Sequence, residues 1–133
     1  MLSVRLLACA QGVIRDADTN QCTVINLVEN LVVPSLPFVV PSLCLFAIIE
    51  RGIRDPTSCT CSVRVRLNDA EVFGRDLAID FGPALRNRTI LYLEELPIDR
   101  AGVIQCRLLH ETTTLGAWDM AVMRADPPAD PSR

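Results

Sequence analysis

The chain has 133 residues, which is typical of a single domain, and half of them are hydrophobic while 22% are charged. Its formal net charge of −3 and its 5% of aromatic residues argue against a nucleic-acid-binding protein, which usually carries a basic excess and stacking side chains. No apolar run approaches the roughly 18 residues that span a bilayer, so we expect no membrane insertion.

The first predicted strand covers residues 2–13, where apolar side chains occur in both phases. Within it, Leu6-Leu7-Ala8-Cys9 resembles a bacterial lipobox, in which the cysteine is lipidated after cleavage. Only eight residues precede Cys9 and Arg5 interrupts them, whereas an export signal has a continuous apolar stretch of roughly 7–15 residues. We therefore expect a strand here and keep an exported or lipid-anchored protein as a third hypothesis.

A polar turn follows the first strand. The pattern Asp16-x-Asp18-x-Asn20 resembles the start of a calcium-binding loop, in which oxygen ligands alternate along the chain. Gln21 and Leu27 stand where the EF-hand pattern requires Gly and Glu. The residues predict a turn stabilised by aspartate side chains, and a Ca²⁺ site formed by Asp16, Asp18 and Asn20 is the alternative.

Residues 22–33 predict one bulged strand or two short ones, and a segment with three prolines, Pro34 to Pro41, comes next. Proline cannot donate to a strand ladder, so we expect a loop or a sheet edge. The apolar side chains of this segment fit two interpretations: a loop folded back over the open end of the sandwich, or a contact surface for a partner or a second subunit. These side chains are Leu36, Phe38, Val39 and Val40.

The rest of the chain predicts strands at 42–50, 59–67, 71–81, 88–93 and 115–124. Residues 96–109 predict a corner, marked by Pro97 and Gly102, that leads into a further long strand. The clearest alternation lies in 59–67, where cysteines and aliphatic residues occupy one face and Arg64 and Arg66 point the other way. This arginine pair is a candidate site for an anionic ligand. Pairing with carboxylates across the sheet is the more common role of such residues.

The sequence contains no arrangement that predicts catalysis or a cofactor. His110 is the only histidine, so a His cluster or a Ser-His-Asp set is not expected. Cys59-x-Cys61 lacks the spacing and the second pair of a structural zinc site. All 13 basic residues are arginine, which excludes a lysine nucleophile and is typical of a GC-rich bacterial coding sequence. We expect a protein that is not an enzyme.

The six cysteines fall mostly on the inward phases of the predicted strands. Buried thiols behave as small hydrophobic groups, and disulfides are rare inside the cell. We therefore expect free thiols in a cytoplasmic protein, with disulfides and a metal site as less favoured alternatives.

About eight strands at intervals of roughly 8–15 residues, without a convincing amphipathic helix, predict an all-β fold. We expect an antiparallel β-sandwich of about 7–9 strands with an immunoglobulin-like or related Greek-key topology. A small closed β-barrel is the alternative. Residues 1–125 should form this single domain, and the proline-rich residues 126–133 a flexible tail.

Several segments together resemble an uncharacterised bacterial family of small β-sandwich proteins, a domain of unknown function. They are the first strand, the aspartate-rich turn, residues 24–31, the proline-rich segment and the late pattern Asp-x-Ala-Gly-x-Ile-x-Cys-x-Leu that ends at Leu108. The resemblance implies a fold and no activity. There is also a partial likeness to immunoglobulin domains, but Ile104 stands at the tyrosine position and Trp118 follows Cys106.

The sequence therefore predicts a protein that acts through protein–protein contacts, by self-association or as an accessory subunit. The apolar side chains of the proline-rich segment are the basis of this expectation. A small-ligand or Ca²⁺-binding module is the alternative, using either the Asp16–Asn20 turn or the face that carries Arg64 and Arg66.

Overall fold

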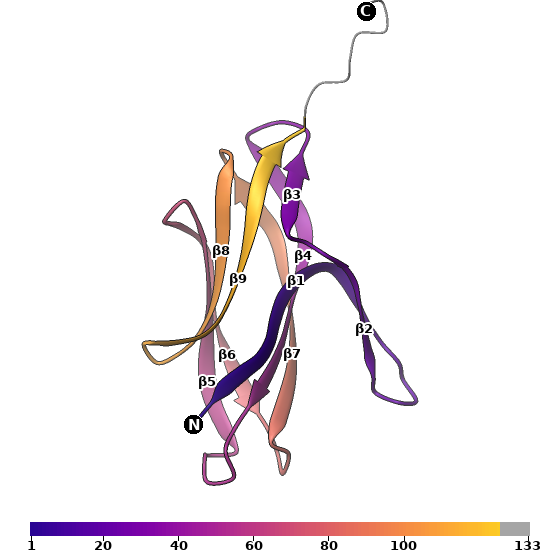
Figure 1. The fold of residues 1–133 in the computed structure, drawn as a ribbon, viewed down its shortest axis with the longest axis vertical. Helices are drawn as coiled ribbons and strands as arrows, with labels where there is room; N and C mark the ends of the chain where they lie inside the picture. Colours follow the sequence, from indigo (N-terminus) through magenta and orange to yellow (C-terminus); the bar gives the residue numbers. More distant parts are fainter. Residues whose placement is uncertain (126–133) are drawn as a thin grey trace, which may run out of the picture.

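Nine strands form two facing sheets in the computed structural model, which describes residues 1–125 (Figure 1). The predicted tail, residues 126–133, lies outside the described residues. The strands are β1 (Ser3–Arg15), β2 (Cys22–Leu27), β3 (Asn30–Val33), β4 (Phe38–Glu50), β5 (Ser58–Leu67), β6 (Ala70–Asp80), β7 (Arg86–Ile98), β8 (Gly102–His110) and β9 (Thr113–Arg124).

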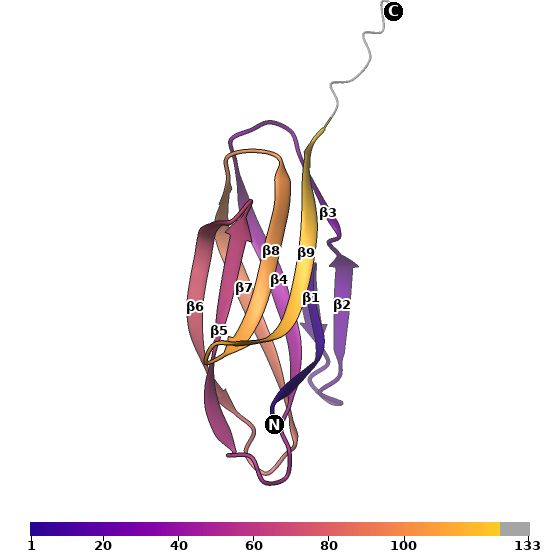
Figure 2. The same cartoon turned by 60° about the vertical axis from the view of Figure 1, so that its left-hand side comes forward.

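One sheet has the strand order β2-β1-β4-β7 and the other the order β3-β9-β8-β5-β6. All neighbouring strands are antiparallel except β3 and β9, which run parallel. The predicted β-sandwich is confirmed, and the closed barrel is wrong because the described strands form two separate sheets with edges. Figure 2 shows β2 and β6 at opposite sides of the molecule.

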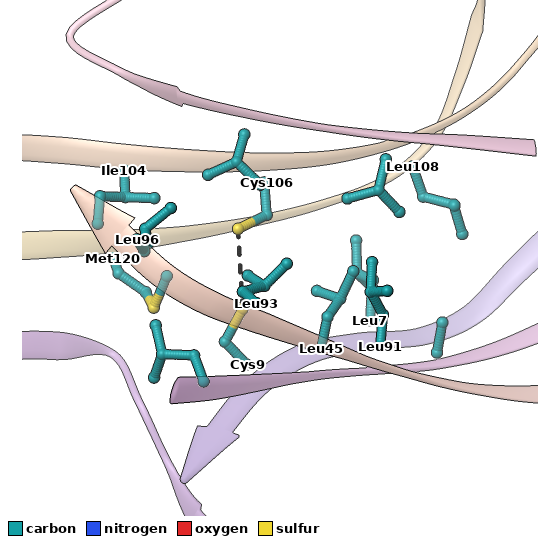
Figure 3. Close-up of a cluster of buried hydrophobic side chains, with 14 of the residues drawn as sticks. Leu7, Cys9, Leu45, Leu91, Leu93, Leu96, Ile104, Cys106, Leu108 and Met120 are labelled. Atoms are coloured by element: carbon teal, nitrogen blue, oxygen red, sulfur yellow. Dashed lines mark hydrogen bonds between the residues drawn. The ribbon is translucent and has the colours of Figure 1, made fainter. Parts of the chain in front are cut away.

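The core lies between the sheets and follows the predicted period-two alternation. In β5, Cys61, Val63, Val65 and Leu67 are buried, and in β8 the same is true of Ile104, Cys106 and Leu108. The four-stranded sheet contributes aliphatic side chains that face them. The labelled residues of Figure 3 show this packing: Leu7, Cys9, Leu45, Leu91, Leu93, Leu96, Ile104, Cys106, Leu108 and Met120.

Residues 22–33 form two short strands, β2 and β3, which belong to different sheets. The proline-rich segment is divided as well. Residues 34–37 form the connection, and β4 begins at Phe38 and includes Pro41. In the β4–β7 register, Val40 pairs with Leu96 and Ser42 pairs with Glu94. Between these pairs, each strand has one unpaired residue, which is Pro41 in β4 and Glu95 in β7. Proline is tolerated there because no ladder bond is required of it.

The β1–β2 hairpin leaves the plane of its sheet. β1 pairs with β4 from Ser3 to Ala10, whereas from Gly12 to Arg15 it pairs only with β2. Figure 1 shows this hairpin beside the sandwich, on the side away from the five-stranded sheet. Its tip is held by Arg88 of β7, which donates hydrogen bonds to the backbone and side-chain oxygens of Asn20, at 2.7 and 2.9 Å.

Burial shows what the hairpin covers. Ala8, Ala10, Cys44 and Phe46 are all buried, yet none of them belongs to the hydrophobic cluster between the sheets. Their side chains occupy the outer face of the four-stranded sheet, since their neighbours in β1 and β4 point into the core. The hairpin is therefore a partial third layer over this face.

Within residues 1–125 we find no helix of the length and apolarity needed to cross a membrane.

Candidate functional site

The Asp16–Asn20 turn uses its oxygens within the protein. Asp16 accepts hydrogen bonds from the backbone N–H groups of Asp18 and Thr19, at 2.8 and 3.0 Å. These bonds, that from Thr19 foremost, lower the pKa of the Asp16 carboxyl group. The side-chain oxygen of Asn20 accepts from Arg15 and Arg88. This is the geometry of a stabilised turn that anchors the hairpin.

The predicted arginine face lies on the outside of the five-stranded sheet. Arg64 lies opposite Arg107 of β8 in the strand register. Its guanidinium nitrogens are 3.4 Å from a carboxylate oxygen of Asp76 and 3.6 Å from a carboxylate oxygen of Glu71. Arg107 in turn contacts Asp119 at 2.6 Å. Carboxylates from neighbouring strands therefore compensate both arginines. Arg66 is exposed on the same face.

Gly74, in the strand next to Arg64, makes this arrangement possible. A Cβ atom at position 74 would lie 3.1 Å from an Nη atom of Arg64. The bulge of this strand pair lies elsewhere, because the β5–β6 register shifts between Val65 and Arg66, opposite Val72. The glycine leaves room for the guanidinium group.

The four apolar residues of the proline-rich segment have different environments. Val40 is buried in the core, and Leu36 and Phe38 are partly buried against it. Three of the four side chains therefore pack inward. Only Val39 is largely exposed. Val40, which follows it in the chain, lines a groove that the sequence does not predict.

This groove has a volume of about 360 Å³ and lies between β3 and the first half of β4. We call it the β3–β4 groove. It exists because β1 pairs with β4 only from Cys44 onwards, and β3 pairs only with β9. All of its lining residues are uncharged: Gln11, Asn26, Leu27, Val28, Asn30, Leu31, Val32, Val40, Ser42 and Leu43.

A second groove, of about 450 Å³, runs along the opposite side of the sandwich between the edge strands β6 and β7. We call it the β6–β7 groove. It contains two charged side chains among apolar and aromatic ones. Its lining residues are Phe73, Arg75, Leu77, Ile90, Leu91, Tyr92 and Glu94.

Side chains of chemical interest line a small pocket of about 190 Å³, which includes Asp55, Cys59 and His110. The carboxylate of Asp55 contacts the amino group of Met1 and accepts from the N–H of Gly52 at 2.7 Å. The amino group contributes most to lowering the pKa of Asp55. In the described part of the chain, no hydrogen bond connects His110 with Cys59.

All six cysteines are free thiols, as the sequence predicts. Cys9 and Cys106 face each other between the sheets with their sulfur atoms 3.7 Å apart (Figure 3). Their contact and their burial raise the pKa of Cys9. Burial is also the main cause that raises the pKa of Cys61 to about 12. Thiols in such surroundings are poor nucleophiles. The residues 1–125 contain no group of three or more His, Cys, Asp or Glu side chains arranged for a metal ion.

The comparisons with known proteins add no relative: no protein-family model matches this chain, and none of the curated proteins is significantly similar to it. The resemblance to a family of small bacterial β-sandwich proteins therefore stays a prediction.

Proposed function

We propose that this protein acts by binding another protein in the β3–β4 groove, as an accessory subunit without catalytic activity. The observation that carries this proposal is the aliphatic rim of an uncharged groove. Leu27 and Val32, which line it, expose 54% and 58% of their surface, and Val39, adjacent to the lining residue Val40, exposes 54%. Exposed aliphatic side chains that gather at one groove are characteristic of interaction surfaces.

The lining indicates which kind of segment fits. Gln11, Asn26 and Asn30 supply side-chain amides among aliphatic side chains. Asn26 donates to the side-chain oxygen of Gln11 at 2.8 Å, and the remaining amide donors and acceptors are left for a ligand. An extended, uncharged segment satisfies both features, because its backbone can bond to the amides while alternate side chains pack on the aliphatic residues. A charged segment would lose its hydration without gaining a compensating charge.

Pairing of a full added strand is less favourable on this side. β3 has only four residues, and Pro41 removes a backbone donor from the exposed part of β4. Recognition in this groove therefore depends on side-chain contacts, which a single charge can disrupt.

Site-specific photo-crosslinking in cells tests the proposal. A photoreactive residue at Leu27 or at Val32 should form covalent adducts with a partner protein, whereas one at Ile53 should not. Ile53 is the matched control because it is 81% exposed but lies in the connection between β4 and β5. The substitution Val39→Asp should abolish the adducts.

Mass spectrometry then identifies the crosslinked segment, which should be uncharged and rich in aliphatic residues. Adducts that are equally abundant at Ile53, or a segment rich in charged residues, would contradict the proposal. Val39→Asp is a better probe than Phe38→Asp, because Phe38 packs against the core and its replacement would destabilise the fold.

A further inference from the structure

The two sheets have four edge strands, and they differ in how well they are protected from pairing with another chain. β2 and β3 are short, with six and four residues. β6 contains a bulge and carries exposed charges such as Glu71, Arg75 and Asp76. Short strands, bulges and charges all discourage the addition of a further strand.

β7 is neither short nor bulged in its central part. It has 13 residues and pairs with β4 alone, without a register shift from Arg86 to Glu94. In an antiparallel ladder, every second residue of an edge strand directs its N–H and C=O groups away from the neighbouring strand. The segment Arg88–Glu94 contains no proline or glycine that would interrupt further pairing.

The side chains of this segment are complementary to themselves. Leu91 and Leu93 point into the core, so Arg88, Ile90, Tyr92 and Glu94 share the outer face of the sheet. A second copy that runs antiparallel, with Leu91 opposite Leu91, places each Arg88 opposite Glu94 and each Ile90 opposite Tyr92. Opposite charges and aromatic–β-branched pairs are both favourable cross-strand neighbours.

The charges at the two ends of this segment are uncompensated within the described chain. Neither Arg88 nor Glu94 takes part in an ion pair among residues 1–125. The hydrogen bonds of Arg88 go to the neutral oxygens of Asn20 through Nη1 and Nη2. A guanidinium group has five N–H donors, so three are left for a carboxylate.

We infer that β7 is a homodimerisation strand, which pairs antiparallel with β7 of a second copy around Leu91. The pairing joins the two four-stranded sheets into one continuous sheet. A two-fold axis perpendicular to this sheet also brings the two β6–β7 grooves together, so that the partly exposed Ile90 and Tyr92 are covered. This inference concerns the side of the sandwich opposite the β3–β4 groove and does not depend on the proposed function.

Sedimentation equilibrium of the full chain from about 10 μM to about 1 mM tests it, since this range covers weak as well as moderate dimers. The wild type should dimerise. Each of the single variants Arg88→Glu and Glu94→Arg places like charges opposite each other at both symmetry-related contacts between positions 88 and 94. Each variant should therefore raise the dimer dissociation constant at least about tenfold.

An equimolar mixture of the two variants should restore the dimer. In the mixed pair, one chain carries carboxylates at both positions and the other carries guanidinium groups at both, so both contacts are attractive. The Arg88→Glu chain still lacks its hydrogen bonds to Asn20 in the mixture. The recovery of the dimer therefore cannot be explained by these bonds. Thermal unfolding checks that each variant is folded, and Val39→Asp, which lies on the other side, should leave the dimer unchanged.

Three results would overturn the inference: a wild type that is monomeric throughout the range, a dimer insensitive to both charge reversals, and single variants whose mixture does not recover. A dimer broken by Val39→Asp but not by Glu94→Arg would also overturn it and would place the second copy in the β3–β4 groove.

Discussion

The two open sides of the sandwich are built differently. The β6–β7 side is bordered by long strands that belong fully to their sheets, whereas the β3–β4 side is bordered by a four-residue strand and by the hairpin that leaves the sheet after Ala10. The first side offers a regular row of backbone groups and alternating side chains. The second offers an uncharged groove of irregular outline. Strand pairing therefore suits the first side, and side-chain recognition the second.

The two sides are also held in place differently. The β6–β7 side is fixed at one end by buried Arg51 and at the other by Asn68. On the β3–β4 side, Trp118 donates to the carbonyl oxygen of Val28 at 2.9 Å, and the hairpin that forms part of the wall depends on the contact of Arg88 with Asn20. We expect substitutions at the fixed ends to lower the free energy of unfolding of the whole domain, and substitutions at the hairpin contact to change only the local opening of the hairpin.

Arg51→Met should have the largest effect. The guanidinium group donates to the carbonyl oxygens of Ala84, Asp55, Gly52 and Pro83 and lies 5.8 Å from the ring centre of Phe81. Its removal leaves these acceptors without their donor, and we expect the free energy of unfolding to fall by about 3 kcal/mol. Chemical denaturation measures this value.

The matched control is Arg54→Met. Arg54 is exposed in the same connection, so its replacement should change stability by less than about 0.5 kcal/mol. Equal effects of the two substitutions would show that burial of Arg51 does not fix this end of the β6–β7 side.

Gly102→Ala should have the next largest effect. A Cβ atom at position 102 would lie 2.0 Å from the side-chain oxygen of Asn68. That side chain donates to the carbonyl oxygen of Ala101 and accepts from the N–H of Val103, so it fixes the turn between β7 and β8. We expect a loss of about 2 kcal/mol, because Asn68 must move and both bonds are lost.

Gly12→Ala is the control for this substitution, since a Cβ atom at position 12 has no atom within 4 Å. Thermal unfolding of both variants should show a clearly lower melting temperature for Gly102→Ala alone. A melting temperature equal to that of the wild type would contradict the role given to Asn68.

The smallest effect is local and concerns Cys44. This thiol is 1% exposed on the outer face that the hairpin covers. Arg88→Ala removes the contact with Asn20, so alkylation of Cys44 should become several times faster. Cys61 lies between the sheets with a pKa of about 12, and its rate should stay unchanged. Mass spectrometry after timed alkylation distinguishes the two thiols, and acceleration at both would indicate global loosening instead of hairpin opening.

The fold was largely predictable because two facing sheets impose a period of two on the strands between them. The strands that contain Val63 and Ile104 show this period without interruption. The pattern does not reveal which strands lie at an edge, since edge position depends on the pairing of distant segments. The complementary order of Arg88, Ile90, Tyr92 and Glu94 is present in the sequence, but it has meaning only once β7 is known to be an edge strand.

The β3–β4 groove was not predictable for a related reason. It combines Gln11 and Asn26 of the hairpin with Ser42 of β4, and it exists because β1 leaves β4 midway. The apolar residues in 2–13 indicate a strand that is buried on both faces. They do not indicate that the β1–β2 hairpin of the same chain covers the outer face. Val40 of the proline-rich segment lines this groove, but three of the four apolar residues of the segment pack inward.

Hydrogen–deuterium exchange at increasing protein concentration tests most directly whether the β6–β7 side is the one that self-associates. We predict that the amide groups of Arg88–Glu94 that point away from β4 become more protected as the concentration rises, while exchange in Asn30–Val33 of β3 stays constant. Protection that grows in β3, or exchange in β7 that does not change while the dimer forms, would contradict the account.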